Sequence, residues 1–253
     1  MIISHTHKRY KDKWNRLANG RYNGAYYYSK EIVKNIIPNV KTDRNWITVN
    51  LPGFGADHSI IFVHNNLHPE NYDWLTRYND IVLVCGVKET CEKIGHIGKA
   101  IYLPLSIDTE EVEKYRQDER HGAAFAGRPS KRTMNGVELP KDIDIIEGLP
   151  RDRFLEEIAK HETIYAVGRT AVEARALGCE IAAYDPRYPD PEVWQVLDNR
   201  EASKILQAEL DAIDCATADM QWTKAELLEY CKAKGIDVNS RLTKAQIMER
   251  INA

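Results

Sequence analysis

The chain has 253 residues, of which 43% are hydrophobic and 29% are charged, and its formal net charge at pH 7 is −3. This composition is typical of a soluble globular protein, and the length suits one large domain or two small ones. The near-neutral charge balance excludes a generally basic nucleic-acid coat, although it is compatible with a local basic surface.

Cysteine content and hydropathy restrict the class of protein further. The five cysteines form no CxxC pair and have no spacing that would build a zinc site, so we expect reduced, mostly buried thiols at Cys85, Cys91, Cys179, Cys215 and Cys231. No window approaches the roughly 20 apolar residues that span a bilayer, and the N-terminal stretch lacks the apolar core of a signal peptide. The sequence therefore predicts no membrane span and a cytoplasmic location.

The first part of the chain alternates short apolar runs with helical segments. A helix over 26–37 is followed by strands at 46–50, 59–65, 80–86 and 99–107, with connecting helices at 69–78 and 87–95. Strands that are apolar nearly throughout, separated by helices, predict a parallel sheet covered on both faces. We assign residues 1–110 to a first Rossmann-like domain on the acceptor side.

The pattern restarts after the polar segment 108–122. Strands are expected at 123–128, 142–149, 163–168 and 180–185, with helices at 151–161 and 170–178. Residues 111–213 are therefore predicted to form a second Rossmann-like domain. Because ligands of such sheets bind beyond the carboxyl ends of the strands, we expect the site in the cleft between the two domains.

The remainder of the chain is predicted to be helical. Helices over 191–199 and 200–213 precede a break at 214–221, and residues 222–253 form a small helix–extended–helix module. In this module Thr223 with Glu226 predicts a capping box, Gly235 ends the first helix, and Thr243 with Gln246 begins the second.

Basic residues follow two strands of the second domain. Arg128 and Lys131 come directly after the strand at 123–128, and the turn Gly168, Arg169, Thr170 opens a helix. Free N–H groups and the positive end of the helix dipole suit this turn to a phosphate. Glu173, one turn further, is a candidate to accept hydrogen bonds from ribose hydroxyls. The structural alternatives are a solvated basic turn and a carboxylate favoured by the dipole alone.

The segments "CGVKETCEKIGHIGKAIYLPLSID", "AAFAGRPSKR" and "YAVGRTAVEARALGCEIAAYD" resemble the junction and the C-terminal half of GT-B glycosyltransferases. The resemblance covers roughly residues 20–200 and implies a nucleotide sugar bound between two Rossmann-like domains. It implies that Arg128 and Lys131 hold the donor diphosphate and that Glu173 holds the donor ribose. Gly24 would match a donor-facing loop, and His64 would lie near the transferred sugar.

General-base catalysis needs a carboxylate or imidazole within hydrogen-bond reach of the acceptor hydroxyl, which makes Asp57, His58 and His64 the candidate catalytic residues. The alternative for "GFGADH" is a flexible loop. The donor is expected to be UDP- or GDP-linked, with no metal and no further cofactor.

The tail "TKAELLEYCKAKGIDVNSRLTKAQIMERI" is similar to HeH/LEM and SAP-like modules, which often bind DNA and are common in phage proteins. The resemblance implies phosphate contacts from six basic residues: Lys224, Lys232, Lys234, Arg241, Lys244 and Arg250. The alternative is a solvated helical pair used for protein contact or dimerisation.

Together these features predict a compact, phage-type GT-B glycosyltransferase that transfers a sugar to an acceptor hydroxyl. Its double-stranded DNA partner would be held by the tail, and the acceptor would be a hydroxylated base, flipped out or approached through the major groove, in the host cytoplasm. The alternatives are a protein or surface-polysaccharide acceptor, and a non-catalytic protein that binds a nucleotide ligand or DNA.

Overall fold

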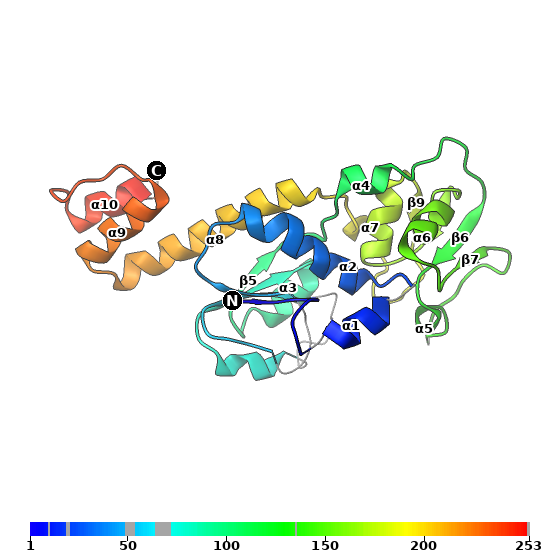
Figure 1. Cartoon of the computed structure of the whole chain (residues 1–253), viewed down its shortest axis with the longest axis horizontal. Coiled ribbons are helices and arrows are strands. Elements are labelled where there is room, and N and C mark those ends of the chain that lie inside the picture. The colour runs from blue at the N-terminus through cyan, green and yellow to red at the C-terminus, as the bar shows by residue number, and fades with distance from the viewer. Residues whose placement is uncertain (10, 19–20, 49–53, 64–71, 135, 252–253) are drawn as a thin grey trace. The chain divides into compact units, whose positions relative to one another are not determined.

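The computed structural model describes residues 1–9, 11–18, 21–48, 54–63, 72–134 and 136–251. By its internal contacts the chain divides into two compact units, Met1–Ile205 and Leu206–Ala253. The first unit contains two parallel sheets, and the second is helical (Figure 1). An α/β fold with two parallel sheets is thus confirmed.

The first sheet has the strand order β1-β2-β3-β4-β5, and every neighbouring pair is parallel. All residues of β3 and β4 are buried, because helices and loops cover both faces of this sheet. Strand β1 was not predicted, since two residues are too short to show a pattern. The strands are β1 (Ile2–Ile3), β2 (Asn45–Ile47), β3 (Ser59–Val63), β4 (Ile81–Cys85) and β5 (Lys99–Tyr102).

The second sheet has the order β7-β6-β8-β9 and is also parallel. Its strands are β6 (Ala123–Ala126), β7 (Asp144–Ile146), β8 (Thr163–Tyr165) and β9 (Glu180–Ala182). The two sheets lie within the ranges 1–110 and 111–213 that the sequence suggested, but both belong to one compact unit.

Most helices of the first unit connect successive strands. They are α1 (Lys11–Ala18), α2 (Gly24–Glu31), α3 (Lys88–Ile94), α4 (Thr109–Glu113), α5 (Pro129–Arg132), α6 (Arg151–Ile158) and α7 (Arg169–Ala176). Helix α2 continues as a π-helix over Ile32–Ile36 and a 3₁₀ turn over Ile37–Asn39, and a further 3₁₀ turn covers Asp73–Arg77. Helix α2 packs against α7, and the ring centroid of Tyr27 on α2 lies 4.8 Å from the guanidinium carbon of Arg151 on α6, so α2 joins the two halves of this unit (Figure 1).

Two predictions for the segment after β9 were wrong. The helix expected over 191–199 is only a 3₁₀ turn, Pro191–Val193, because Trp194 leaves the helical conformation and buries its indole against Tyr188, with ring centroids 5.1 Å apart. The break expected at 214–221 is absent, since α8 runs without interruption over Asn199–Gln221. The segment "DCATADMQ" contains neither glycine nor proline, so nothing in it ends a helix.

The second unit packs α9 (Lys224–Lys234) against α10 (Lys244–Ile251) around a small core of Leu227, Cys231, Ile247 and Met248. The predicted capping box of Thr223 and Glu226 is present, and Gly235 ends α9 with φ +72°. Among the residues that the structure describes, no helix has both the length and the apolar character needed to cross a bilayer.

Core burial predicts unequal effects of the same substitution in two strands. Ile60 is fully buried in the central strand β3, whereas Ile145 is 45% exposed in the edge strand β7. Ile60→Ala should lower the free energy of unfolding by about 2–5 kcal/mol, because it removes buried methyl groups and leaves a cavity. Ile145→Ala should cost less than about 1 kcal/mol. Urea unfolding followed by far-UV circular dichroism measures both, and equal losses would contradict the assigned core.

Candidate functional site

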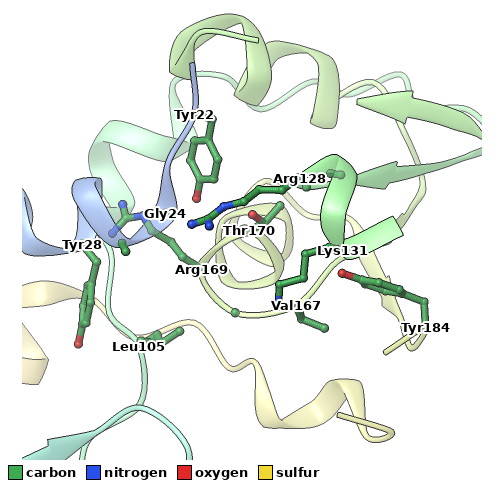
Figure 2. A pocket seen from close by; sticks show the side chains of 14 residues that line it. Tyr22, Gly24, Tyr28, Leu105, Arg128, Lys131, Val167, Arg169, Thr170 and Tyr184 are labelled. Carbon is green, nitrogen blue, oxygen red and sulfur yellow. The ribbon is translucent and has the colours of Figure 1, made fainter. Parts of the chain in front are cut away.

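A cavity of about 340 Å³ lies at the carboxyl ends of the strands of the second sheet (Figure 2). The turns after β6 and β8 form one wall, with Tyr184 from the segment after β9. The start of α2 and Leu105, which follows β5, form the other wall. The lining residues are Tyr22, Gly24, Ala25, Tyr28, Leu105, Ala126, Gly127, Arg128, Lys131, Val167, Gly168, Arg169, Thr170 and Tyr184.

Two helix N-termini open onto this cavity. Helix α7 begins at Arg169, after Gly168 with φ +66° and ψ −142°, a conformation that only glycine adopts readily, and no side chain caps this start. Helix α2 begins at Gly24, where a Cβ atom would lie 3.4 Å from the Cβ of Arg169. The side chain of Asn23 caps α2 by accepting from the N–H of Tyr26 at 3.1 Å, so the uncapped N–H groups are those of α7. Because these groups and two positive dipole ends meet here, this wall attracts an anion.

Two cationic side chains add to this positive potential. Arg128 is exposed and precedes α5, and Lys131 is within that helix. Figure 2 shows the guanidinium of Arg128 directed toward Tyr22, and Lys131 directed toward Val167. Burial lowers the pKa of Lys131, and the charges of Arg187 and Arg128 lower it further, whereas the carboxylate of Asp185, 4.0 Å from Nζ, partly offsets this. The described lining contains no aspartate or glutamate, so the cavity has a net positive charge.

Arg169 contributes a buried guanidinium to the same wall. Its side chain is 4% exposed; Nε donates to Oε1 of Glu173 at 2.9 Å, and Nη2 pairs with Glu31 on α2. Burial alone would lower the pKa of Arg169, but the two carboxylates raise it. Within the described part of the chain, Nη1 is buried and has no hydrogen-bond partner. The guanidinium is thus a buried charge within this wall, held by carboxylates from two helices.

Glu173 is placed differently from the expectation that it binds ribose. Its carboxylate is fully buried and does not line the cavity. Oε2 accepts a hydrogen bond from the Tyr22 hydroxyl at 2.6 Å, and Oε1 accepts from Arg151 and Arg169. Burial alone would raise the pKa of Glu173, but the two arginines lower it. In this arrangement the carboxylate of Glu173 holds Tyr22, Arg151 and Arg169 in place, and it is not exposed to a ligand in the cavity.

The candidate bases Asp57 and His58 lie away from the cavity. They directly precede β3, at the amino edge of the first sheet, whereas Leu105 reaches the cavity from the carboxyl end of β5. His58 has φ +50°, its Nδ1 is 2.5 Å from Oδ2 of Asp80, and its Nε2 is 2.9 Å from Oδ1 of Asp43. Burial alone would lower the pKa of His58, but the hydrogen bonds to the two aspartates raise it.

Asp57 accepts a hydrogen bond from the backbone N–H of Asn79 at 2.7 Å, so both candidates hold turns at this edge. The structure therefore does not place these two candidate bases in the cavity lining. The third candidate, His64, lies outside the described residues.

The structure brings together all five predicted diphosphate residues, Arg128, Lys131, Gly168, Arg169 and Thr170, and places Gly24 opposite them. Sequence reasoning missed Tyr22, Tyr28, Leu105 and Tyr184. Tyr22 stacks on Phe154 of α6 with ring centroids 4.4 Å apart, a contact between residues far apart in the chain that no local pattern signals. The only hint was the glycine that interrupts the tyrosine-rich segment "RYNGAYYYS".

The predicted phosphate-binding residues of the second unit differ in whether their side chains already have partners within the protein. Lys234 is engaged, with Nζ 2.6 Å from Oδ1 of Asp211 and 5.8 Å from the centroid of the Tyr230 ring. The other predicted phosphate contacts are exposed: Lys224, Lys232, Arg241, Lys244 and Arg250.

Comparisons with protein-family models, with curated proteins and with solved structures find no match to this chain.

The buried ion cluster predicts an acid-dependent stability. Glu173→Gln should lower the free energy of unfolding by about 3–5 kcal/mol, since it leaves the two buried arginines Arg151 and Arg169 with Glu31 as their only buried counter-charge among the described residues. Because the pKa of Glu173 is lowered in the folded protein, its contribution is present above the ordinary value of 4.5 and is lost as pH falls below it. The variant should therefore lose less stability on acidification than the parent protein.

Denaturant unfolding between pH 3 and 7 tests this, with Glu192→Gln as the control, because Glu192 forms an exposed pair with Arg175. Parallel pH profiles for Glu173→Gln and the parent would contradict the assigned charge state of Glu173.

Proposed function

We propose that the cavity binds the diphosphate of a nucleoside diphosphate sugar and that the protein is a GT-B-type glycosyltransferase. One observation carries the proposal: two helix N-termini, Arg128 and Lys131 line one cavity whose described lining has no carboxylate. A diphosphate is the common ligand group whose size and charge suit this set of donors.

The same groups suit the chemistry of transfer. When the bond between the sugar and the diphosphate breaks, negative charge builds up on the leaving phosphate oxygen. Arg128 would bind phosphate oxygens in a bidentate manner, Lys131 would supply a point charge, and the N–H groups at the start of α7 would donate to the remaining oxygens. Donors positioned before the reaction stabilise such charge without reorganising, so this step needs no metal ion.

The role proposed for Glu173 is indirect. Glu173 forms ion pairs with Arg151 and Arg169 and accepts a hydrogen bond from the Tyr22 hydroxyl. These contacts would hold the starts of α2 and α7 in position at the cavity. Among the candidate bases, His64 is the one that follows a strand at its carboxyl end, and its role stays a proposal.

Arg128 and Arg132 provide a matched test of the diphosphate site. Arg132 is four residues further along the chain but pairs with Glu147 at 3.3 Å and does not line the cavity. Arg128→Ala should weaken binding of UDP or GDP by about 10- to 100-fold, because a charge-assisted hydrogen bond contributes about 1.5–3 kcal/mol. Arg132→Ala should leave binding unchanged.

Thermal shift with UDP, GDP, ADP and inorganic pyrophosphate measures the binding. A ligand at 100 times its Kd should add about 2.7 kcal/mol of stability. Equal loss in both variants, or no shift with any diphosphate, would contradict the site. Hydrolysis of a nucleotide sugar by the parent protein separates an enzyme from a non-catalytic nucleotide binder.

We also propose that the second unit binds nucleic-acid phosphates, because five of its predicted contact residues are exposed. In the full chain, a Lys224→Glu and Lys244→Glu double variant should bind DNA more weakly and show a shallower dependence of log K on log salt than the parent. Lys234→Gln, which alters a lysine already engaged by Asp211, is the control. Absence of salt-sensitive binding by the parent would favour a protein-contact role for this unit.

A further inference from the structure

A second cavity, of about 490 Å³, lies beside the first within the same unit. It is built where β4 passes into α3, at Tyr102 on the end of β5, and along residues 187–193 after β9. Its apolar surface comes from Val87, Tyr102, Tyr188, Pro189 and Val193. Tyr102 is 40% exposed and Val193 is 37% exposed, so this surface is open to a ligand.

The second cavity is lined by both acidic and basic side chains, whereas the described lining of the first cavity has basic side chains and no acidic one. Arg187 is neutralised by Asp185, at 2.6 Å between Nη2 and Oδ2, and Glu89 is neutralised by Lys93 at 2.5 Å. Lys88, Glu92 and Asp190 remain without an ion pair among the described residues, which leaves the rim slightly acidic. A phosphodiester chain would be repelled here, whereas a neutral polar ligand would meet both donors and acceptors.

The two cavities are adjacent along one segment of chain. Tyr184 lines the first and Arg187 lines the second, and three residues span at most about 11 Å. The carboxylate of Asp185 lies between them: its Oδ2 contacts Arg187 at 2.6 Å and Lys131, which lines the first cavity, at 4.0 Å. The two cavities are therefore neighbours, separated by the short segment that contains Asp185.

A neutral carbohydrate fits this combination of groups. The apolar face of a sugar ring packs against an aromatic ring such as that of Tyr102, and its hydroxyls donate to the carboxylates of Glu92 and Asp190 and accept from Lys88. An apolar surface with a few polar groups around it is also the usual character of a small-molecule site.

We infer that the second cavity is the acceptor site and that it takes a neutral carbohydrate, an inference that rests on the proposed transferase function. The acceptor hydroxyl oxygen forms the new bond to the anomeric carbon of the donor sugar. The bond from that carbon to the diphosphate breaks, and the diphosphate leaves with the electron pair. The hydroxyl proton passes to water.

Substitution of Tyr102 in the full chain tests the inference. The parent protein should bind one or more neutral glycans on a glycan array, and saturation-transfer NMR with the bound glycan gives its affinity. Tyr102→Ala should weaken that binding at least tenfold, Tyr102→Phe should retain it because the ring is kept, and Ile145→Ala, at an exposed edge strand, should leave it unchanged.

Other outcomes would overturn the inference. Binding of no neutral glycan, glycan binding that survives Tyr102→Ala, or Tyr102-dependent binding of a hydroxymethylated DNA oligonucleotide in place of a glycan would each do so. A loss of UDP or GDP binding in Tyr102→Ala would assign this cavity to the donor nucleoside.

Failure of the diphosphate site would be recognised separately. In that case Arg128→Ala would leave nucleotide binding unchanged, whatever the glycan result.

Discussion

The site depends on the ion pairs that the buried guanidinium of Arg169 forms with two carboxylates. The guanidinium pairs with Glu31 of α2 and with Glu173 of α7, so one charged group ties together helices from the two halves of the first unit. Glu31 also accepts from the side chain of Asn199 at 3.0 Å and from the backbone N–H of Asp108 at 3.1 Å. Because an unpaired charge is costly in the interior, this set of contacts strongly favours a single arrangement of the two helix starts.

That arrangement separates charges that stabilise the fold from charges that face a ligand. Glu31 and Glu173 balance Arg151 and Arg169, and the four side chains are almost completely buried. Arg128 and Lys131 lie outside this balanced set and line the cavity. The positive potential of the cavity therefore comes from these two cations and from the helix starts.

The two cavities have complementary chemistry. The first is lined by cations and N–H groups, and the second by an aromatic ring, valines and a slightly acidic rim. Asp185 stands between them and contacts a cation from each. The proposed transfer would use the first cavity to stabilise an anionic leaving group and the second to hold a neutral nucleophile.

The sequence by itself determined the features that depend on local pattern. The buried strands β3 and β4 were predictable because both faces of a parallel strand are covered, so the apolar run is unbroken. The cap at Thr223 and the helix end at Gly235 were predictable because they depend on neighbours within four residues. The grouping of Arg128 with the turn at Gly168 followed from the rule that carboxyl ends of parallel strands share one edge.

Only the tertiary structure decided how those groups are used. Glu173 has the local environment of a ligand-binding carboxylate, but Tyr22, 151 residues away, and Arg151, 22 residues away, occupy it. His58 resembles a catalytic base in its sequence context and proved to hold the opposite edge of its sheet. Such roles are set by contacts between distant residues, and a local pattern carries no information about which distant side chain will neutralise a charge.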